Sequence, residues 1–302
     1  MALAFRSWIG CPSRETPKLA EVCPAATIVL VREGRQEGGS PEIFFVRRHH
    51  RSGFMANAYV FPGGRLEASD TSDALQRFVD GDRQALRERM GGADGTDPEG
   101  HAVAAIRETF EEAGFLLAFE GDSVLRVEHD AKVARYQAHR DALNKGETTF
   151  AEILRKEGLR ISLDSVHYFA NWVTPVAEKR RYNARFFVAI APEGQAGSHD
   201  EIETTDSCWL SAGGALMAYE QGGFSLAPPT WHILRTLTSC KSVDEVLAWG
   251  RSVSEVVPIM PHFLVEDGET VLALPGDDQH PDSTGSNKHH RIVLRNGRWS
   301  QD

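Results

Sequence analysis

Three carboxylates within one short segment, residues 101–115, could act together. Glu108, Glu111 and Glu112 stand at i, i+3 and i+4 of a run with helical periodicity, so an α-helix would gather them on one face. The opposite face would carry an apolar stripe made of Val103, Ile106, Phe110 and Ala113. The segment therefore predicts a helix that packs on a sheet and presents a concentrated anionic patch.

A hard divalent cation would relieve the repulsion among these like charges, which otherwise favours proton uptake. Oxygen-only ligands suit Mg2+ or Mn2+, and Mg2+ takes phosphate oxygens of a substrate as further ligands. Arg107 adjoins the patch and could orient one carboxylate by a charge-assisted hydrogen bond. On helical geometry alone, the alternative is an ordinary solvated acidic face.

The order of the residues favours the metal hypothesis. Residues 107–115, RETFEEAGF, match the pattern R-E-U-x-E-E-x-G-U of the Nudix hydrolases, where U is apolar or Thr. This pattern is the second half of the family's sequence motif, the Nudix box, and residues 61–67, FPGGRLE, resemble the first half. The chain is thus identified as a member of the Nudix hydrolases. This resemblance implies an α/β fold, an α/β/α sandwich with a mixed sheet.

The resemblance also implies roles for individual residues. The metal ligands would be Gly63, Glu108, Glu111 and Glu112, where glycine lets the Gly63 carbonyl approach an ion. The catalytic residues would be Arg107, Glu111, Glu112 and a further acid in the loop before a late strand. For that acid we expect Glu203 in preference to Glu201, because strict alternation would place Glu203 on the face of Trp209.

The box departs from the usual pattern G-x5-E-x7-R-E in two ways. Asp70 stands where the family has Glu, so either Asp70 or Glu67 takes that role, and an insertion at 71–97 separates the two halves. A split box of this kind is similar to the peroxisomal-type coenzyme A diphosphatases and their bacterial relatives. We expect the insertion to be a helical excursion beside the active site, outside the core.

Arginines near predicted strand ends are candidate phosphate contacts. They are Arg47, Arg48, Arg51, Arg180, Arg181 and Arg185, and the alternative is that they belong to solvated turns. The segment 172–187 also resembles the same diphosphatase branch. The resemblance favours hydrolysis of coenzyme A or acyl-coenzyme A to 4′-phosphopantetheine and 3′,5′-ADP, with ADP-ribose or NADH as the alternative substrate. A non-catalytic nucleotide-binding sensor is the alternative of another class.

Composition limits the kinds of molecule that the protein is expected to bind and the compartment in which it is expected to work. A net charge of −10 and a pI near 5.7 argue against a nucleic-acid-binding surface, so we expect a small-molecule nucleotide partner. No apolar run approaches the ~18 residues of a membrane span. The four cysteines show no paired spacing, which favours a reducing compartment, and we expect a cytoplasmic protein. The sequence leaves the oligomeric state open, a homodimer included.

The distribution of apolar, glycine and proline residues predicts the domain boundaries and the secondary structure of the chain. We expect an N-terminal arm at 1–22, a Nudix domain at 23–240 and a small C-terminal appendage at 241–302, closed by a tight hairpin at Asn296 and Gly297. Strands are expected at 25–31, 42–46, 59–61, 115–119, 168–174, 184–190 and 207–210. Helices are expected at 131–143, with Arg140 on an exposed face, and at 149–157, 213–219 and 228–237.

Overall fold

The computed structural model describes residues 20–35, 39–51, 55–91, 97–283 and 290–301. The chain divides into two compact units. The larger comprises Pro24–Asn171 and Ala184–Val257, and the smaller comprises Met1–Cys23, Trp172–Asn183 and Pro258–Asp302. Helix α8 (Val243–Ser252), which follows the boundary predicted at 240, groups with the larger unit. Most of the predicted arm lies outside the described residues.

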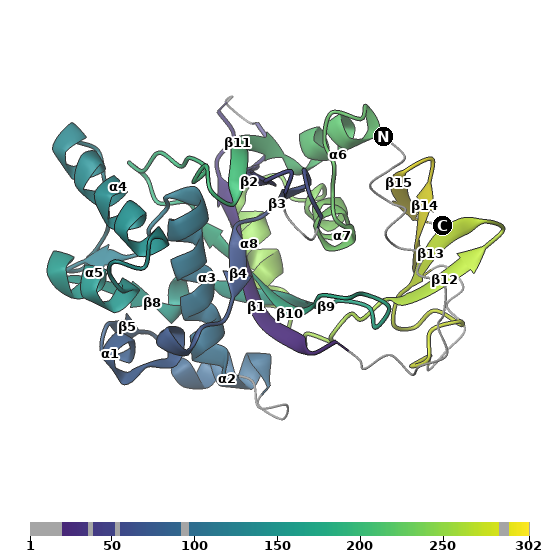
Figure 1. The fold of residues 1–302 in the computed structure, drawn as a ribbon, viewed down its shortest axis with the longest axis horizontal. Coiled ribbons are helices and arrows are strands. Elements are labelled where there is room, and N and C mark those ends of the chain that lie inside the picture. The colour runs from purple at the N-terminus through teal and green to yellow at the C-terminus, as the bar shows by residue number, and fades with distance from the viewer. Residues whose placement is uncertain (1–19, 36–38, 52–54, 92–96, 284–289, 302) are drawn as a thin grey trace. The chain divides into compact units, whose positions relative to one another are not determined.

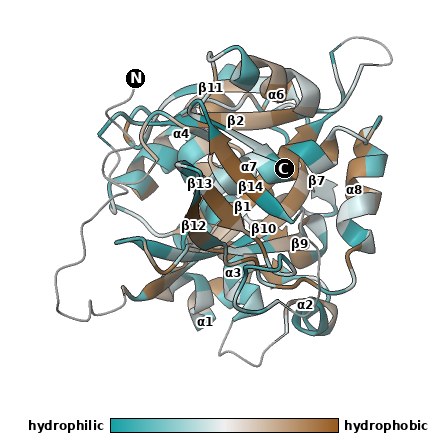
Figure 2. Ribbon diagram, turned by 90° about the vertical axis from the view of Figure 1, so that its right-hand side faces the viewer, coloured by the Kyte–Doolittle hydropathy of each residue, from teal (hydrophilic) through white to brown (hydrophobic). Residues whose placement is uncertain are grey.

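A seven-stranded sheet organises the fold (Figure 1). Its main path runs β11-β2-β1-β10-β9, with β3 paired to β2 and β4 paired to β1. The strands are β1 (Val22–Arg32), β2 (Glu42–Arg48), β3 (Tyr59–Val60), β4 (Gly63–Arg65), β9 (His167–Val173), β10 (Arg181–Ile190) and β11 (Thr204–Ser211). Figure 2 shows β1 and β2 as mostly hydrophobic strands, as expected for strands buried on both faces. The predicted α/β class is confirmed.

Helix α3 (Pro98–Ala113) packs on one face of this sheet. Its buried side chains join those of β1 and β2 in the main hydrophobic core. Asp97 caps it by accepting the Gly100 amide at 2.8 Å, and Gly114 ends it with a φ of 74°, a left-handed conformation that glycine adopts without a steric penalty. The helix predicted around the three carboxylates is confirmed.

Other helices flank α3 or cover the opposite face (Figure 1). α4 (Asp130–Asn144) and α5 (Phe150–Glu157) lie beyond α3, whereas α6 (Ala212–Glu220) and α7 (Pro228–Leu237) cover the other side of the sheet. Phe224, between α6 and α7, packs edge-on against Phe45 of β2, with ring centroids 5.4 Å apart. Helix α8 packs against β10, since a Cβ on Gly250 would lie 2.6 Å from Val188.

The insertion contributes to the core, so the expectation of a peripheral excursion is wrong. It follows a 3-10 turn (Ala68–Thr71) and contains α1 (Asp73–Gln76), β5 (Val79–Asp80) and α2 (Arg83–Met90). The side chains of Leu75, Val79, Leu86 and Met90 are buried in the main core. β5 also pairs in parallel with β8 (Leu159–Ser162), which pairs with β6 (Phe119–Glu120), and β6 pairs with β7 (Ser123–Val124). A second 3-10 turn, Leu163–Ser165, follows β8.

The strand expected at 115–119 is absent apart from its last residue. Leu116 instead bonds a side chain: its amide donates to Gln195 Oε1 at 2.9 Å, and Gln195 Nε2 donates to its carbonyl at 3.0 Å. Because the backbone groups of Leu116 are satisfied there, they are not available for a strand ladder.

The smaller unit holds an antiparallel sheet in the order β12-β13-β14-β15. Its strands are β12 (His262–Glu266), β13 (Glu269–Ala273), β14 (Arg291–Arg295) and β15 (Arg298–Gln301). The predicted hairpin is confirmed, with positive φ of 51° at Asn296 and 75° at Gly297. Among the described residues, no helix is long and apolar enough to span a membrane.

Candidate active site

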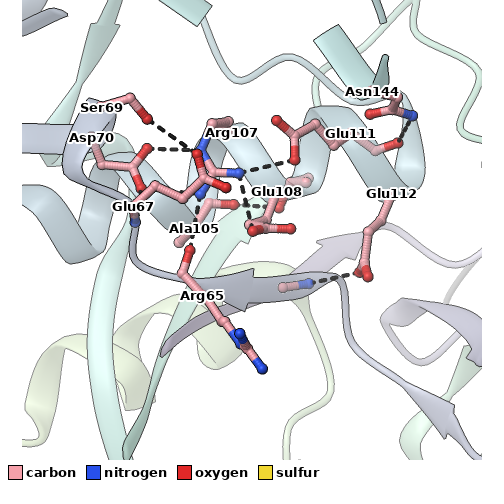
Figure 3. Close-up of polar contacts among 12 residues, drawn as sticks. Arg65, Glu67, Ser69, Asp70, Ala105, Arg107, Glu108, Glu111, Glu112 and Asn144 are labelled. Atoms are coloured by element: carbon pink, nitrogen blue, oxygen red, sulfur yellow. Dashed lines mark hydrogen bonds and ion pairs between the residues drawn. The ribbon is translucent and has the colours of Figure 1, made fainter. Parts of the chain in front are cut away.

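Arg107 holds two of the three carboxylates of α3 (Figure 3). Its Nη1 donates to Glu108 Oε1 at 3.0 Å and to Glu111 Oε2 at 2.9 Å. Glu112 points away from this pair and is 5% exposed. The predicted hydrogen bond from Arg107 to a carboxylate is thus confirmed, and it reaches two carboxylates at once.

Asp70, and not Glu67, is the acid that pairs with Arg107. Arg107 Nε donates to Asp70 Oδ1 at 2.7 Å and Nη2 donates to Oδ2 at 3.0 Å, while Asp70 is 0% exposed. Glu67 is exposed, and its amide donates to Asp70 Oδ2 at 2.8 Å. The two-pronged geometry leaves Arg107 little freedom to turn away from the carboxylates of α3.

Two successive glycines let the chain approach these carboxylates closely. The Gly63 amide donates to Glu112 Oε2 at 2.9 Å, and a Cβ on Gly63 would lie 2.4 Å from the Ala26 carbonyl oxygen. A Cβ on Gly64 would lie 2.4 Å from the Glu108 carboxylate. The structure therefore brings Gly63 to Glu112 through its amide, while the predicted contact of its carbonyl with a metal stays a prediction.

Burial and mutual repulsion favour the protonated forms of the carboxylates. Burial, with the charge of Glu111 adding to it, raises the pKa of Glu108 to about 8 although Arg107 acts in the opposite direction. Burial and the charge of Glu108 raise the pKa of Glu112 well above its usual range. A divalent cation would favour the ionised forms and remove this cost.

The donor set fits a hard cation in its chemistry. Three carboxylates on one helix face supply the oxygens that Mg2+ and Mn2+ prefer. Within the part of the chain that the structure describes, no three His, Cys, Asp or Glu side chains converge as they stand on a metal position. Glu112 faces the Gly63 amide and the other two face Arg107, so binding an ion requires these side chains to turn toward one another.

Glu203 lies near this cluster, although strand alternation from Trp209, which predicted it, does not reach it. β11 begins at Thr204 and its register shifts between Thr204 and Asp206, so alternation from Trp209 does not extend to Glu203. Its charge nevertheless raises the pKa of both Glu108 and Glu112. Among the described residues, its carboxylate makes no hydrogen bond or ion pair.

Of the arginines, Arg48 rather than Arg47 faces α3. Successive residues of β2 point to opposite faces, and Phe44 and Val46 pack in the core that contains α3. The charge of Arg48 accordingly lowers the pKa of Glu112, whereas the Arg47 guanidinium lies 5.8 Å from the ring centroid of Tyr59. The sequence prediction named Arg47 and Arg48 together, and alternation from Phe44 and Val46 would have separated them.

The other predicted arginines differ in burial and in the unit to which they belong. Arg51 and Arg180 are exposed, and Arg185 is buried in β10. Arg181 is buried and donates to the Thr174 carbonyl at 3.1 Å and toward Met260 Sδ at 3.5 Å, inside the smaller unit. Arg180 also belongs to the smaller unit, whereas α3 belongs to the larger one, and a part for Arg180 and Arg181 in phosphate binding stays a prediction.

Comparisons with known proteins agree with the box and the fold. A family model described as the NUDT19 Nudix domain matches residues 97–237. The acyl-coenzyme A diphosphatase NUDT19 of Xenopus laevis is 28% identical over 85% of this chain and 81% of its own length, and that of Homo sapiens is 26% identical over 84% and 79%. The crystal structure of a NUDIX hydrolase from Alicyclobacillus acidocaldarius is similar with a TM-score of 0.61 and 25% identity, covering 76% of this chain and 97% of that one.

Proposed function

The chain belongs to the Nudix superfamily of hydrolases acting on phosphoric anhydrides, and on that premise we propose that its substrate is coenzyme A or acyl-coenzyme A. The products would be 4′-phosphopantetheine, or its acylated form, and 3′,5′-ADP. The observation that carries the proposal is the likeness to acyl-coenzyme A diphosphatases over 85% of the chain. The carboxylate helix, whose four charged positions are intact, supports catalysis over a sensor role.

Nudix hydrolases need a divalent metal ion, and here we propose Mg2+ or Mn2+. Glu108, Glu111, Glu112 and the Gly63 carbonyl would hold it. When bound, such an ion neutralises negative charge that develops on the diphosphate. The raised pKa values of Glu108 and Glu112 support this assignment. They show that the ionised carboxylates are unfavourable without a counter-ion, and a bound cation would stabilise the ionised forms.

The chain's own residues would prepare the attack of water. Arg107 holds Glu108 and Glu111 by hydrogen bonds. Glu203, whose carboxylate is engaged by no other side chain in the described residues, would accept a proton from the attacking water. As the new P–O bond forms, the bond from phosphorus to the bridging oxygen breaks and the leaving phosphate takes the electron pair.

Arginines would set the preference for coenzyme A over ADP-ribose and NADH. Coenzyme A carries a 3′-phosphate that these alternatives lack, and a guanidinium fork binds phosphate with two hydrogen bonds. The candidates remain Arg47, Arg48, Arg51, Arg180, Arg181 and Arg185. Of these, Arg48 is favoured because its charge already reaches Glu112.

A substrate panel tests the proposal. Coenzyme A, an acyl-coenzyme A, dephospho-coenzyme A, ADP-ribose and NADH are each incubated with Mg2+ or Mn2+, and products are identified by mass spectrometry. We expect the highest kcat/KM for coenzyme A or its acyl form. A tenfold preference for ADP-ribose or NADH would overturn the substrate assignment and leave the hydrolase standing, whereas tight binding without turnover would favour a sensor. A cytoplasmic location and a homodimer are also part of the proposal, and fractionation and light scattering test them.

A further inference from the structure

Arg140 of α4 is buried against the C-terminal end of α3, contrary to the expectation that it lies on an exposed face. It is 2% exposed. Its Nε donates to the Glu111 carbonyl at 2.8 Å, and its Nη2 and Nη1 donate to the carbonyl and hydroxyl of Ser198 at 2.9 and 3.2 Å. One guanidinium therefore joins the metal helix to the segment that precedes β11.

Burial of the Arg140 guanidinium by itself lowers the free energy of unfolding. The hydrogen-bond partners of Arg140 among the described residues are neutral oxygens, and burying a cation without a hydrogen-bonded carboxylate is unfavourable. Burial lowers the pKa of Arg140, and the charges of Asp200 and Glu112 act against that shift. An apolar side chain of similar length would fill the space without this penalty, so the hydrogen bonds of Arg140 require another explanation.

The junction between helix and loop is tied at further points. The Ser198 amide donates to the Ala113 carbonyl at 3.0 Å. Gly114 lies between the two elements, and a Cβ there would be 3.1 Å from Arg140 Nη1. The end of α3, the guanidinium and Ser198 are thus packed without space for an additional side chain.

The same loop is held by hydrogen bonds between Asp200 and Glu203. Asp200 Oδ1 accepts the amides of Ile202, Glu203 and Thr204 at 3.1, 3.1 and 2.9 Å. At the far end, the His49 amide donates to the Glu203 carbonyl at 2.8 Å. A displacement at Ser198 would therefore be transmitted to Glu203 and not absorbed between them.

We propose that Arg140 is a positioning residue that anchors loop 198–204 to the end of α3 and thereby places Glu203 beside Glu108 and Glu112. The proposal rests on the proposed function in one respect, because it takes Glu203 as the acid that assists hydrolysis. A misplacement of about 1 Å in a catalytic group can lower turnover by about a hundredfold, so an anchor outside the substrate's reach can control kcat.

A double-mutant cycle tests the coupling. We expect Arg140→Met to lower kcat about 10- to 100-fold while KM changes less than about twofold, and Arg140→Lys to fall between Arg140→Met and the wild type. In a Glu203→Gln background, Arg140→Met should lower kcat by less than about twofold. Equal effects of Arg140→Met in both backgrounds would overturn the proposal. The control is Arg135→Met, on the same helix but exposed and paired with Glu157 at 3.1 Å, which should leave kcat unchanged.

Hydrogen–deuterium exchange supplies a measurement that does not depend on activity. Arg140→Met should speed exchange of the amides in 198–204 by about tenfold or more, while the amides of 102–110 in α3 keep their protection. Unchanged exchange in 198–204 would overturn the anchor. Loss of protection across the whole chain would show that Arg140 serves global folding, and it would also overturn the anchor. Arg140→Lys, the milder substitution, should show the same local pattern with a smaller change. Absence of diphosphatase activity in the wild type would instead refute the proposed function and leave the exchange result to decide the anchor.

Discussion

Asp70 and Arg107 lie 37 positions apart in the chain and form a buried two-pronged ion pair, with Nε–Oδ1 and Nη2–Oδ2 distances of 2.7 and 3.0 Å. The pair connects the two halves of the motif across the insertion. Because the same guanidinium also holds Glu108 and Glu111, the geometry of the α3 carboxylates depends on an acid from the far side of that insertion.

Replacing Asp70 should destabilise the protein strongly. Asp70→Asn leaves a buried guanidinium without its carboxylate, and breaking a buried pair costs about 3 to 5 kcal/mol in the free energy of unfolding. Urea denaturation measures the change. The matched control is Asp80→Asn, which removes an exposed pair with Arg160 and should cost less than about 1 kcal/mol. Equal losses for the two variants would contradict the role of Asp70.

Removing a single helix carboxylate should abolish most of the activity without unfolding the protein. Glu108→Gln and Glu112→Gln each remove a charge and a metal oxygen, so we expect kcat to fall by about two orders of magnitude or more. Steady-state kinetics with Mg2+ and Mn2+ measures this, and circular dichroism checks the fold. Glu120→Gln, an exposed acid paired with Lys132, is the control. Near wild-type turnover in either helix variant would refute the metal-helix assignment.

The stabilisation by metal should increase with pH. Glu108 has a raised pKa of about 8 in the folded protein, against 4.5 for an ordinary glutamate. Its contribution to stability is complete below about pH 4.5 and is lost as the pH rises through about 8, because the folded state binds the proton more tightly. The Tm in EDTA should therefore fall more steeply between pH 5 and 8 than the Tm in Mg2+.

Thermal unfolding at several pH values with each additive measures this difference. Glu108→Gln, which cannot titrate at that position, should flatten the curve in EDTA. A gap between the two Tm values that is independent of pH would show that metal binding does not compete with protonation of these carboxylates.

The two loop acids should behave differently. Glu203→Gln should lower kcat at least about tenfold, since the charge of Glu203 reaches Glu108 and Glu112. Glu201→Gln should have little effect, because Glu201 is exposed and has a turn conformation with a φ of 62°. Comparing kcat for the two variants under saturating metal tests the assignment. The opposite ranking would move the catalytic acid to Glu201.

The insertion should be necessary for folding. Leu75 is 1% exposed and belongs to the main core, so Leu75→Ala should lower the free energy of unfolding by about 2 to 5 kcal/mol. Gln84→Ala, on the exposed side of α2, should change it by less than about 0.5 kcal/mol. A soluble, cooperative, active protein after replacement of 71–96 by a short loop would contradict this.

The sequence predicted those elements whose local signals agree with their packing. α7 begins at Pro228 and ends at Leu237 as expected, since proline at the first helical position and an apolar periodicity both indicate it. α3 was predicted from the helical periodicity of its carboxylates and its apolar stripe. The carboxylate cluster followed from spacing within a single helix, and that information is local.

Features that depend on distant partners could not be read in this way. The segment 115–118 has strand-like residues, but Gln195 occupies the backbone groups of Leu116. Arg140 looks like a surface cation of α4 until Ser198 and the end of α3 are placed beside it. Glu203 was selected through an alternation that the register shift in β11 interrupts, so only its proximity in space supports it.

The length of the chain between Asp70 and Arg107 has a kinetic consequence. Asp70 and Arg107 close a loop of 37 positions, whereas the usual motif spacing closes a loop of eight. The longer loop raises the entropic free-energy cost of closure by roughly 1.4 kcal/mol, so the two side chains would meet about tenfold more slowly. Native contacts of α1, β5 and α2 with the core shorten the effective loop before the ion pair can close. The two halves of the motif should therefore come together late in folding, after the insertion has docked, and stopped-flow refolding of Asp70→Asn should show a nearly unchanged folding rate and faster unfolding.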